Sequence, residues 1–218
     1  MNIYLLVCVI AAMAIWLYKV YQRDSAKAKT NQLHPFNDCI PVLQEVKLIN
    51  QESGFPKLYG RYGEFDVVLE LVADTLAVRK LPPLWLLVAI KGRVLTKGSL
   101  DIVVRPQNNE FYSPAWEWSG HLQTPENWPA HSLIKYQNEP ASLEVLNDFV
   151  PLLFSDERYK ELLVLPNILR ITYLAKQAER GEYMLMRNSL FDAKPLEREL
   201  VKSIIIKAIY IREALEKN

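Results

Sequence analysis

The chain of 218 residues is poor in cysteine and glycine and carries almost no net charge. Its two cysteines are Cys8, in an apolar run, and Cys39, so no disulfide is expected within the folded part. A secreted domain would more often carry paired cysteines. The formal net charge is +1, from 26 basic and 25 acidic side chains that are interspersed throughout. Nucleic-acid binding requires a concentrated basic face, so no nucleic-acid partner is expected.

The chain also lacks the short motifs that carry common chemistry. It contains no G-x-G-x-x-G or G-x-x-x-x-G-K-[ST] loop, no G-x-S-x-G elbow, no H-E-x-x-H and no C-x-x-C. His121 and His131 lie in a proline-rich stretch, but a metal site needs three or four ligands with supporting hydrogen bonds. The sequence therefore predicts no enzyme, no metal site and no cofactor.

What the chain does have is an apolar run at its start. No side chain from Ile3 to Tyr18 is charged, and Val20 and Tyr21 extend the run past Lys19. About 20 apolar residues in a helix are needed to cross a hydrocarbon layer of roughly 30 Å. Residues 1–21 are therefore predicted to form a transmembrane anchor in contact with a lipid bilayer.

Aromatic and basic side chains gather at the C-terminal end of this run. Amphipathic rings favour the membrane interface, and a lysine there can extend its ammonium to the headgroups. Basic residues flank this end alone, which predicts a single-pass signal-anchor protein with its folded domain in the cytoplasm. The predicted interface residues are Trp16, Tyr18, Lys19, Tyr21 and Arg23.

Two other interpretations of this run remain open. The small-x-small pattern Ala12-Met13-Ala14 fits the cleavage site of a signal peptide, but the residues before the run supply no basic side chain, and the apolar residues continue beyond the site. The run can also be interpreted as a buried core helix, although such helices are usually shorter and apolar on one side only.

After a predicted juxtamembrane linker over residues 22–39, residues 40–218 are predicted to form one α+β domain with a mainly antiparallel sheet. Apolar and polar side chains alternate from Phe65 to Val72, as in a half-buried strand, and the apolar run from Leu84 to Ile90 favours a strand buried on both faces. Short connections between such runs favour antiparallel neighbours. Further strands are predicted at 75–79 and 100–104.

The last third of the chain is predicted to contain a helix, a pair of strands and a final helix. An apolar face at helical spacing follows Ser142, and strands are predicted over 162–174 and 182–191. An apolar stripe including Ile204 follows Pro195 and predicts a C-terminal amphipathic helix. That helix is expected either to pack on its own sheet or to dock on another subunit.

Between these halves lies the aromatic segment, residues 105–131, which combines five aromatic rings with four prolines. Large rings dominate protein-contact hot spots, and long structured loops are often functional. The alternative is that the rings fill one end of the sheet as part of its core. The candidate partner-contact residues are Phe111, Tyr112, Trp116, Trp118 and Trp128.

Two functional hypotheses follow. In the first, the chain is a membrane-anchored accessory or assembly subunit that contacts a membrane-protein partner through the aromatic segment or the final helix. In the second, it is a membrane-tethered domain that binds or senses a small ligand or lipid in an apolar pocket beneath the same segment. A flat exposed aromatic patch would favour the first, and a deep enclosed cavity the second.

Overall fold

The computed structural model describes residues 7, 9–19, 34–51, 54–76, 81–94, 96, 98–141, 143–186 and 189–217. In this part of the chain nine antiparallel strands form one sheet, with the order β1-β2-β3-β4-β9-β8-β5-β7-β6. The strands are β1 (Gln44–Ile49), β2 (Lys57–Tyr62), β3 (Phe65–Ala73), β4 (Pro83–Lys91), β5 (Ser99–Val104), β6 (Gly120–Leu122), β7 (Ser132–Gln137), β8 (Tyr159–Leu165) and β9 (Ile168–Gln177).

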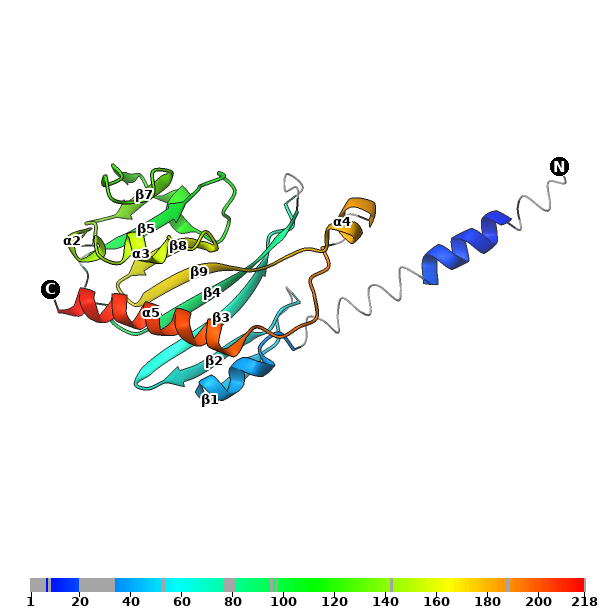
Figure 1. The fold of residues 1–218 in the computed structure, drawn as a ribbon, viewed down its shortest axis with the longest axis horizontal. Coiled ribbons are helices and arrows are strands. Elements are labelled where there is room, and N and C mark those ends of the chain that lie inside the picture. Colours follow the sequence, from blue (N-terminus) through cyan, green and yellow to red (C-terminus); the bar gives the residue numbers. More distant parts are fainter. Residues whose placement is uncertain are drawn as a thin grey trace.

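The helices are few, and most are short. Besides the helical residues 9–19, those in the described part of the chain are η1 (Asn37–Val42), η2 (Pro114–Glu117), α2 (Leu143–Leu146), α3 (Val150–Leu153), α4 (Arg180–Met186) and α5 (Arg198–Glu216). Figure 1 shows α5 lying across one face of the sheet, where it contacts β4 and β9. The helix begins soon after Pro195, as the sequence indicated, and its buried positions include Val201, Ile204 and Ala208.

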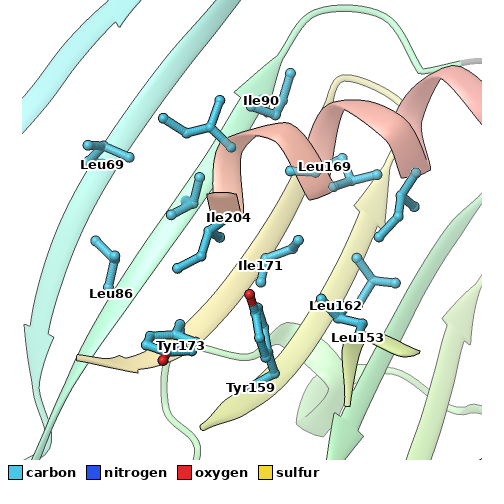
Figure 2. Packing of buried hydrophobic residues seen from close by; sticks show 14 of the residues in the cluster. Leu69, Leu86, Ile90, Leu153, Tyr159, Leu162, Leu169, Ile171, Tyr173 and Ile204 are labelled. Carbon is cyan, nitrogen blue, oxygen red and sulfur yellow. The ribbon is translucent and has the colours of Figure 1, made fainter. Parts of the chain in front are cut away.

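The main apolar core lies between α5 and the sheet. In β3, the side chains of Val67, Leu69 and Leu71 belong to this core. Figure 2 shows Ile204 of α5 among the side chains of the central strands, with Ile171 of β9 close by. Because side chains alternate along a strand, Asp66, Val68 and Glu70 point to the opposite side, which we call the outer face of the sheet.

Arg212 ties the end of α5 to the end of β4. Its guanidinium donates to the carbonyl oxygens of Lys91, at 2.9 Å, and Arg93, at 3.0 Å. Gly92 between them has φ +117°, and a Cβ there would approach the guanidinium to 3.1 Å. A glycine is required at this turn both for its backbone conformation and for the close approach of Arg212.

The predicted α+β class is wrong, because the described fold is mostly one large antiparallel sheet with few helices. Part of the error lies in the predicted strands over 162–174 and 182–191. Pro166 and Asn167 divide the first into two strands, β8 and β9, which pair as a tight hairpin. Residues 180–186 form α4 and not a strand.

The prediction of a transmembrane helix at the start of the chain is also wrong. Residues 9–19 are helical, and these eleven residues span only about 16 Å. Among the described residues, no helix has both the length and the apolarity that a membrane crossing requires. The single-pass signal-anchor prediction and the membrane location assigned with it are therefore wrong. Residues 1–6, 8, 20 and 21 of the predicted span lie outside the described residues.

The folded part begins before residue 40, where the sequence prediction placed the start of the domain. Phe36 and Cys39 belong to the core, and the Leu196 N–H donates to the Pro35 carbonyl oxygen at 2.9 Å. Burial, with the nearby charge of Asp38, raises the pKa of the Cys39 thiol to about 12, so this thiol is unreactive at neutral pH. Most of the predicted linker, residues 22–33, lies outside the described residues.

Candidate functional site

The first part of the aromatic segment, residues 105–118, is held on the outer face of the sheet by buried polar contacts. The carboxylate of Glu110 is fully buried and pairs with the Lys160 ammonium at 2.9 Å. It also accepts the N–H groups of Gln107 at 2.8 Å and Asn109 at 3.2 Å. Burial raises the pKa of Glu110, but the hydrogen bond and charge of Lys160 and the two backbone N–H groups together outweigh burial, and the net pKa lies below its usual value. Glu110 is therefore an ionised anchor of the loop.

A second anchor comes from Arg170 in β9. Its guanidinium pairs with Glu161 of β8 through two atoms, at 2.9 and 3.2 Å, and donates to the Tyr112 carbonyl oxygen at 2.8 Å. The Thr172 hydroxyl donates to the same Glu161 carboxylate. Because the Glu161 side chain is fully buried, this paired geometry satisfies a charge that would otherwise be costly to bury.

Asp101 of β5 supplies a third anchor, since its carboxylate accepts the Ser113 hydroxyl at 2.6 Å. Ser113 in turn caps η2 by accepting the Ala115 N–H at 3.2 Å. Burial raises the pKa of Asp101 well above its usual range, and the nearby charge of Glu161 raises it further. Asp101 and Glu161 are both 0% exposed, so this pair of carboxylates is closed to a substrate and holds structure together.

These anchors hold one aromatic ring out into solvent. Phe111 lies between the buried Glu110 and the bound carbonyl of Tyr112, and it is 56% exposed. Its ring packs edge-on against Tyr112, with centroids 5.7 Å apart, and Tyr112 packs against Trp85 of β4 at 5.8 Å. The sequence prediction named Phe111 and Tyr112 together, and the structure brings them into contact.

The three tryptophans of the aromatic segment have different environments. Trp116 is 39% exposed and donates its indole N–H to the Glu110 carbonyl oxygen at 3.1 Å. Trp118 is buried, and Trp128 belongs to the main core, where its N–H donates to the Asn147 side chain at 2.8 Å. The apolar area that this segment offers to a partner is therefore mostly that of Phe111 and Trp116.

A hollow of about 510 Å³ lies beside Phe111. The sheet residues that line it include Glu70, Leu71, Val72 and Ala73 of β3, Leu87 of β4 and Arg170 of β9; the rest are Gln51, Phe55, Thr75, Phe111 and Tyr112. Glu70 pairs with Lys57 at 2.8 Å, and Arg170 pairs with Glu161. The charged groups at this hollow therefore already have partners, and most of its other lining side chains are apolar or aromatic.

A second hollow, of about 540 Å³, lies over β1 to β4. Both of its acidic side chains, Glu45 and Asp66, lie 3.6 Å from Arg61. The Lys91 ammonium lies over the Tyr59 ring, 5.3 Å from its centroid. This hollow has no exposed ring held beside it, which sets it apart from the hollow at Phe111.

The remaining sequence candidates do not form a site. His121 and His131 are both exposed, and among the described residues no three metal-ligating side chains gather. Trp16, Tyr18 and Lys19 are exposed on the helix of residues 9–19, while Tyr21 and Arg23 lie outside the described residues.

Sequence reasoning missed the polar anchors. Asp101 and Arg170 each interrupt an apolar strand, which is the signal that could have revealed them.

Comparisons of the chain with protein-family models, curated proteins and solved structures found no match.

Proposed function

We propose that this chain is an accessory or assembly protein that acts by contacting another protein through Phe111 and the hollow beside it. The observation that supports this proposal is a ring 56% exposed on a loop whose neighbouring residues are fixed by buried ion pairs. An aromatic side chain on a rigid loop adds contact area without a large loss of conformational entropy on binding.

The size of the hollow alone does not separate the two functional hypotheses, because about 300–1,000 Å³ is usual for small-ligand sites. Its other features favour a protein. A ligand site generally encloses its aromatic side chains, whereas Phe111 projects from the rim and Trp116 adds a second exposed ring on the same segment. Exposed rings beside a groove are typical of the hot spots at which proteins meet.

Capture experiments with matched variants test this proposal. Full-length protein, Phe111→Ala and Tyr210→Ala would be used to capture proteins from an extract of the source organism, with quantification by mass spectrometry. Tyr210 is an aromatic residue with 60% exposure on α5, so it controls for the loss of any exposed ring. We expect a partner that is retained by Tyr210→Ala and reduced at least tenfold by Phe111→Ala. Equal capture by all three proteins would contradict the proposal.

A further inference from the structure

The second hollow, over β1 to β4, lies on the outer face of the sheet, as Phe111 does. Every residue that lines it belongs to one of these four strands, so no described loop or helix contributes to it. A hollow on bare sheet is accessible to part of another protein, whereas small-ligand sites enclose most of the ligand. The lining residues are Glu45, Lys47, Ile49, Tyr59, Gly60, Arg61, Asp66, Val67, Val68 and Lys91.

The two hollows follow one another along β3. Because side chains alternate along a strand, the outward ones here are those of Asp66, Val68, Glu70 and Val72. The first two residues line the second hollow, and the last two line the hollow beside Phe111. Val68 and Val72 are only about 13 Å apart along an extended strand. A partner segment that reaches the hollow beside Phe111 can therefore also reach the second hollow.

The second hollow carries an excess of one positive charge. Its carboxylates, from Glu45 and Asp66, both lie 3.6 Å from Arg61. Its other two charged residues, Lys47 and Lys91, are exposed, and within the described part of the chain neither ammonium forms an ion pair. One additional carboxylate would therefore bring the charge of this hollow to zero.

The two lysines are arranged around a single aromatic ring. Lys91 of β4 extends over β3, and its ammonium lies 5.3 Å from the centroid of the Tyr59 ring in β2. Lys47 is the cross-strand neighbour of Tyr59 in β1. The face of a ring attracts an ammonium but occupies only one side of it, so N–H donors remain for an anion. The arrangement places two cationic side chains beside the same part of the hollow.

We infer that the partner proposed above is a protein whose contact segment carries an acidic side chain, which binds at Lys47 and Lys91, together with an apolar side chain placed beside Phe111. This inference rests on the proposed function and specifies the chemistry of the partner. Complementary charges speed association and discriminate against the wrong partners. A carboxylate suits this hollow better than a nucleic-acid backbone, because the chain has a net charge of only +1 and no concentrated basic face.

A random peptide library displayed on phage, selected on the full-length protein, supplies a probe. Peptides that bind the full-length protein but not Phe111→Ala are measured by calorimetry, and we expect them to combine an apolar residue with Asp or Glu. Lys47→Gln/Lys91→Gln should weaken their binding at least about fivefold, because it removes both ammonium groups. The matched control, Lys202→Gln/Lys217→Gln, removes the same charge from α5 and its C-terminal end, so it should retain binding.

A double-mutant cycle tests whether the loss comes from an ionic contact. Replacing the acidic residue of the peptide by its amide should weaken binding to the full-length protein by a similar factor. The same replacement should have little further effect on binding to Lys47→Gln/Lys91→Gln, since the contact is already lost there. Raising the ionic strength should weaken binding of the acidic peptide more than that of the amide peptide.

Peptides that depend on Phe111 but bind both double variants equally would overturn this inference while the proposed protein contact stands. If the library yields no such peptide, the partner captured through Phe111 is the probe, and its equal capture by the two double variants would overturn the inference as well. Lysine-dependent binding of a short single-stranded oligonucleotide in place of an acidic peptide would identify a phosphate ligand and also overturn it. Loss of the Phe111 dependence in the capture experiment would instead overturn the proposed function itself.

Discussion

The two faces of the sheet are stabilised by different physical means. On the α5 face, apolar side chains such as Ile204, Leu69 and Ile171 pack together, and their stabilisation is non-directional and proportional to buried area. On the outer face, a loop is held by ion pairs and hydrogen bonds that depend on geometry. Apolar packing tolerates small shifts, whereas a buried ion pair that loses one member leaves an uncompensated charge. The first face holds the fold together, and the second positions one exposed ring.

The largest effect should come from a charge placed in the apolar face. Ile204→Asp buries a carboxylate that has no partner and removes apolar contacts, so we expect a loss of more than about 4 kcal/mol in the free energy of unfolding. Ser203→Asp places the same group one position earlier, where the side chain is exposed, and should change stability by less than about 1 kcal/mol. Urea titration of both variants measures the difference. Similar midpoints would contradict the described orientation of α5.

The next largest effect should come from breaking the buried ion pair between Arg170 and Glu161 on the outer face. Arg170→Met leaves the buried Glu161 carboxylate without its partner, and we expect a loss of about 3–5 kcal/mol. The double variant Arg170→Met/Glu161→Met removes both charges and should recover much of that loss. Chemical denaturation of the two variants provides the measurement. A double variant no more stable than the single one would show that the ion pair is not what stabilises this region.

A smaller effect separates the two environments within the aromatic segment. Trp128→Ala opens a cavity in the main core and removes the hydrogen bond to Asn147, so we expect a loss of about 3 kcal/mol. Trp116→Ala, at a ring that is 39% exposed, should cost less than about 1 kcal/mol. Melting curves for both variants test this ranking, and a reversed order would place Trp116 in the core.

The effect that is smallest over a single pH unit concerns Asp101. Because the pKa of Asp101 is raised in the folded state, the folded chain keeps this proton above the unfolded pKa of about 3.9, where the unfolded chain has lost it. Stability should therefore fall as pH rises from about 4 toward the folded pKa, by at most about 1.4 kcal/mol per pH unit. The lowered pKa of Glu110 acts in a separate window, since its contribution is lost only as pH falls below about 4.3 toward its folded pKa. Asp101→Asn should flatten the slope above pH 4, which denaturation at several pH values would show.

Local patterns in the sequence were informative about individual strands and less so about their assembly. Alternation at Phe65–Val72 and the apolar run at Leu84–Ile90 lie within β3 and β4. The position of β9 next to β4 was not foreseen, because it depends on pairing between residues 77 to 94 positions apart. The irregular composition of the aromatic segment also concealed η2 and β6.

The candidate site was partly visible in the sequence, through Phe111 and Tyr112. The contacts that hold these two residues in place could not be predicted from the sequence, because the anchoring residues come from distant parts of the chain. They are Asp101, Glu110, Glu161 and Arg170. The apolar run at the start of the chain was misleading. Its composition suggested a membrane span, but no helix among the described residues is long and apolar enough to form one.

The place of β9 in the middle of the sheet has a consequence for how the chain is synthesised. β4 is buried along nearly its whole length, and one of its edges pairs with β9, which ends at Gln177. While the ribosome is still adding residues 92–177, the hairpins β1 to β4 can form, but β4 is left with an open apolar edge. Nascent chains with such edges are prone to associate with one another. Pairing of such distant segments is also slow, so the nascent chain is exposed to aggregation until its last third emerges.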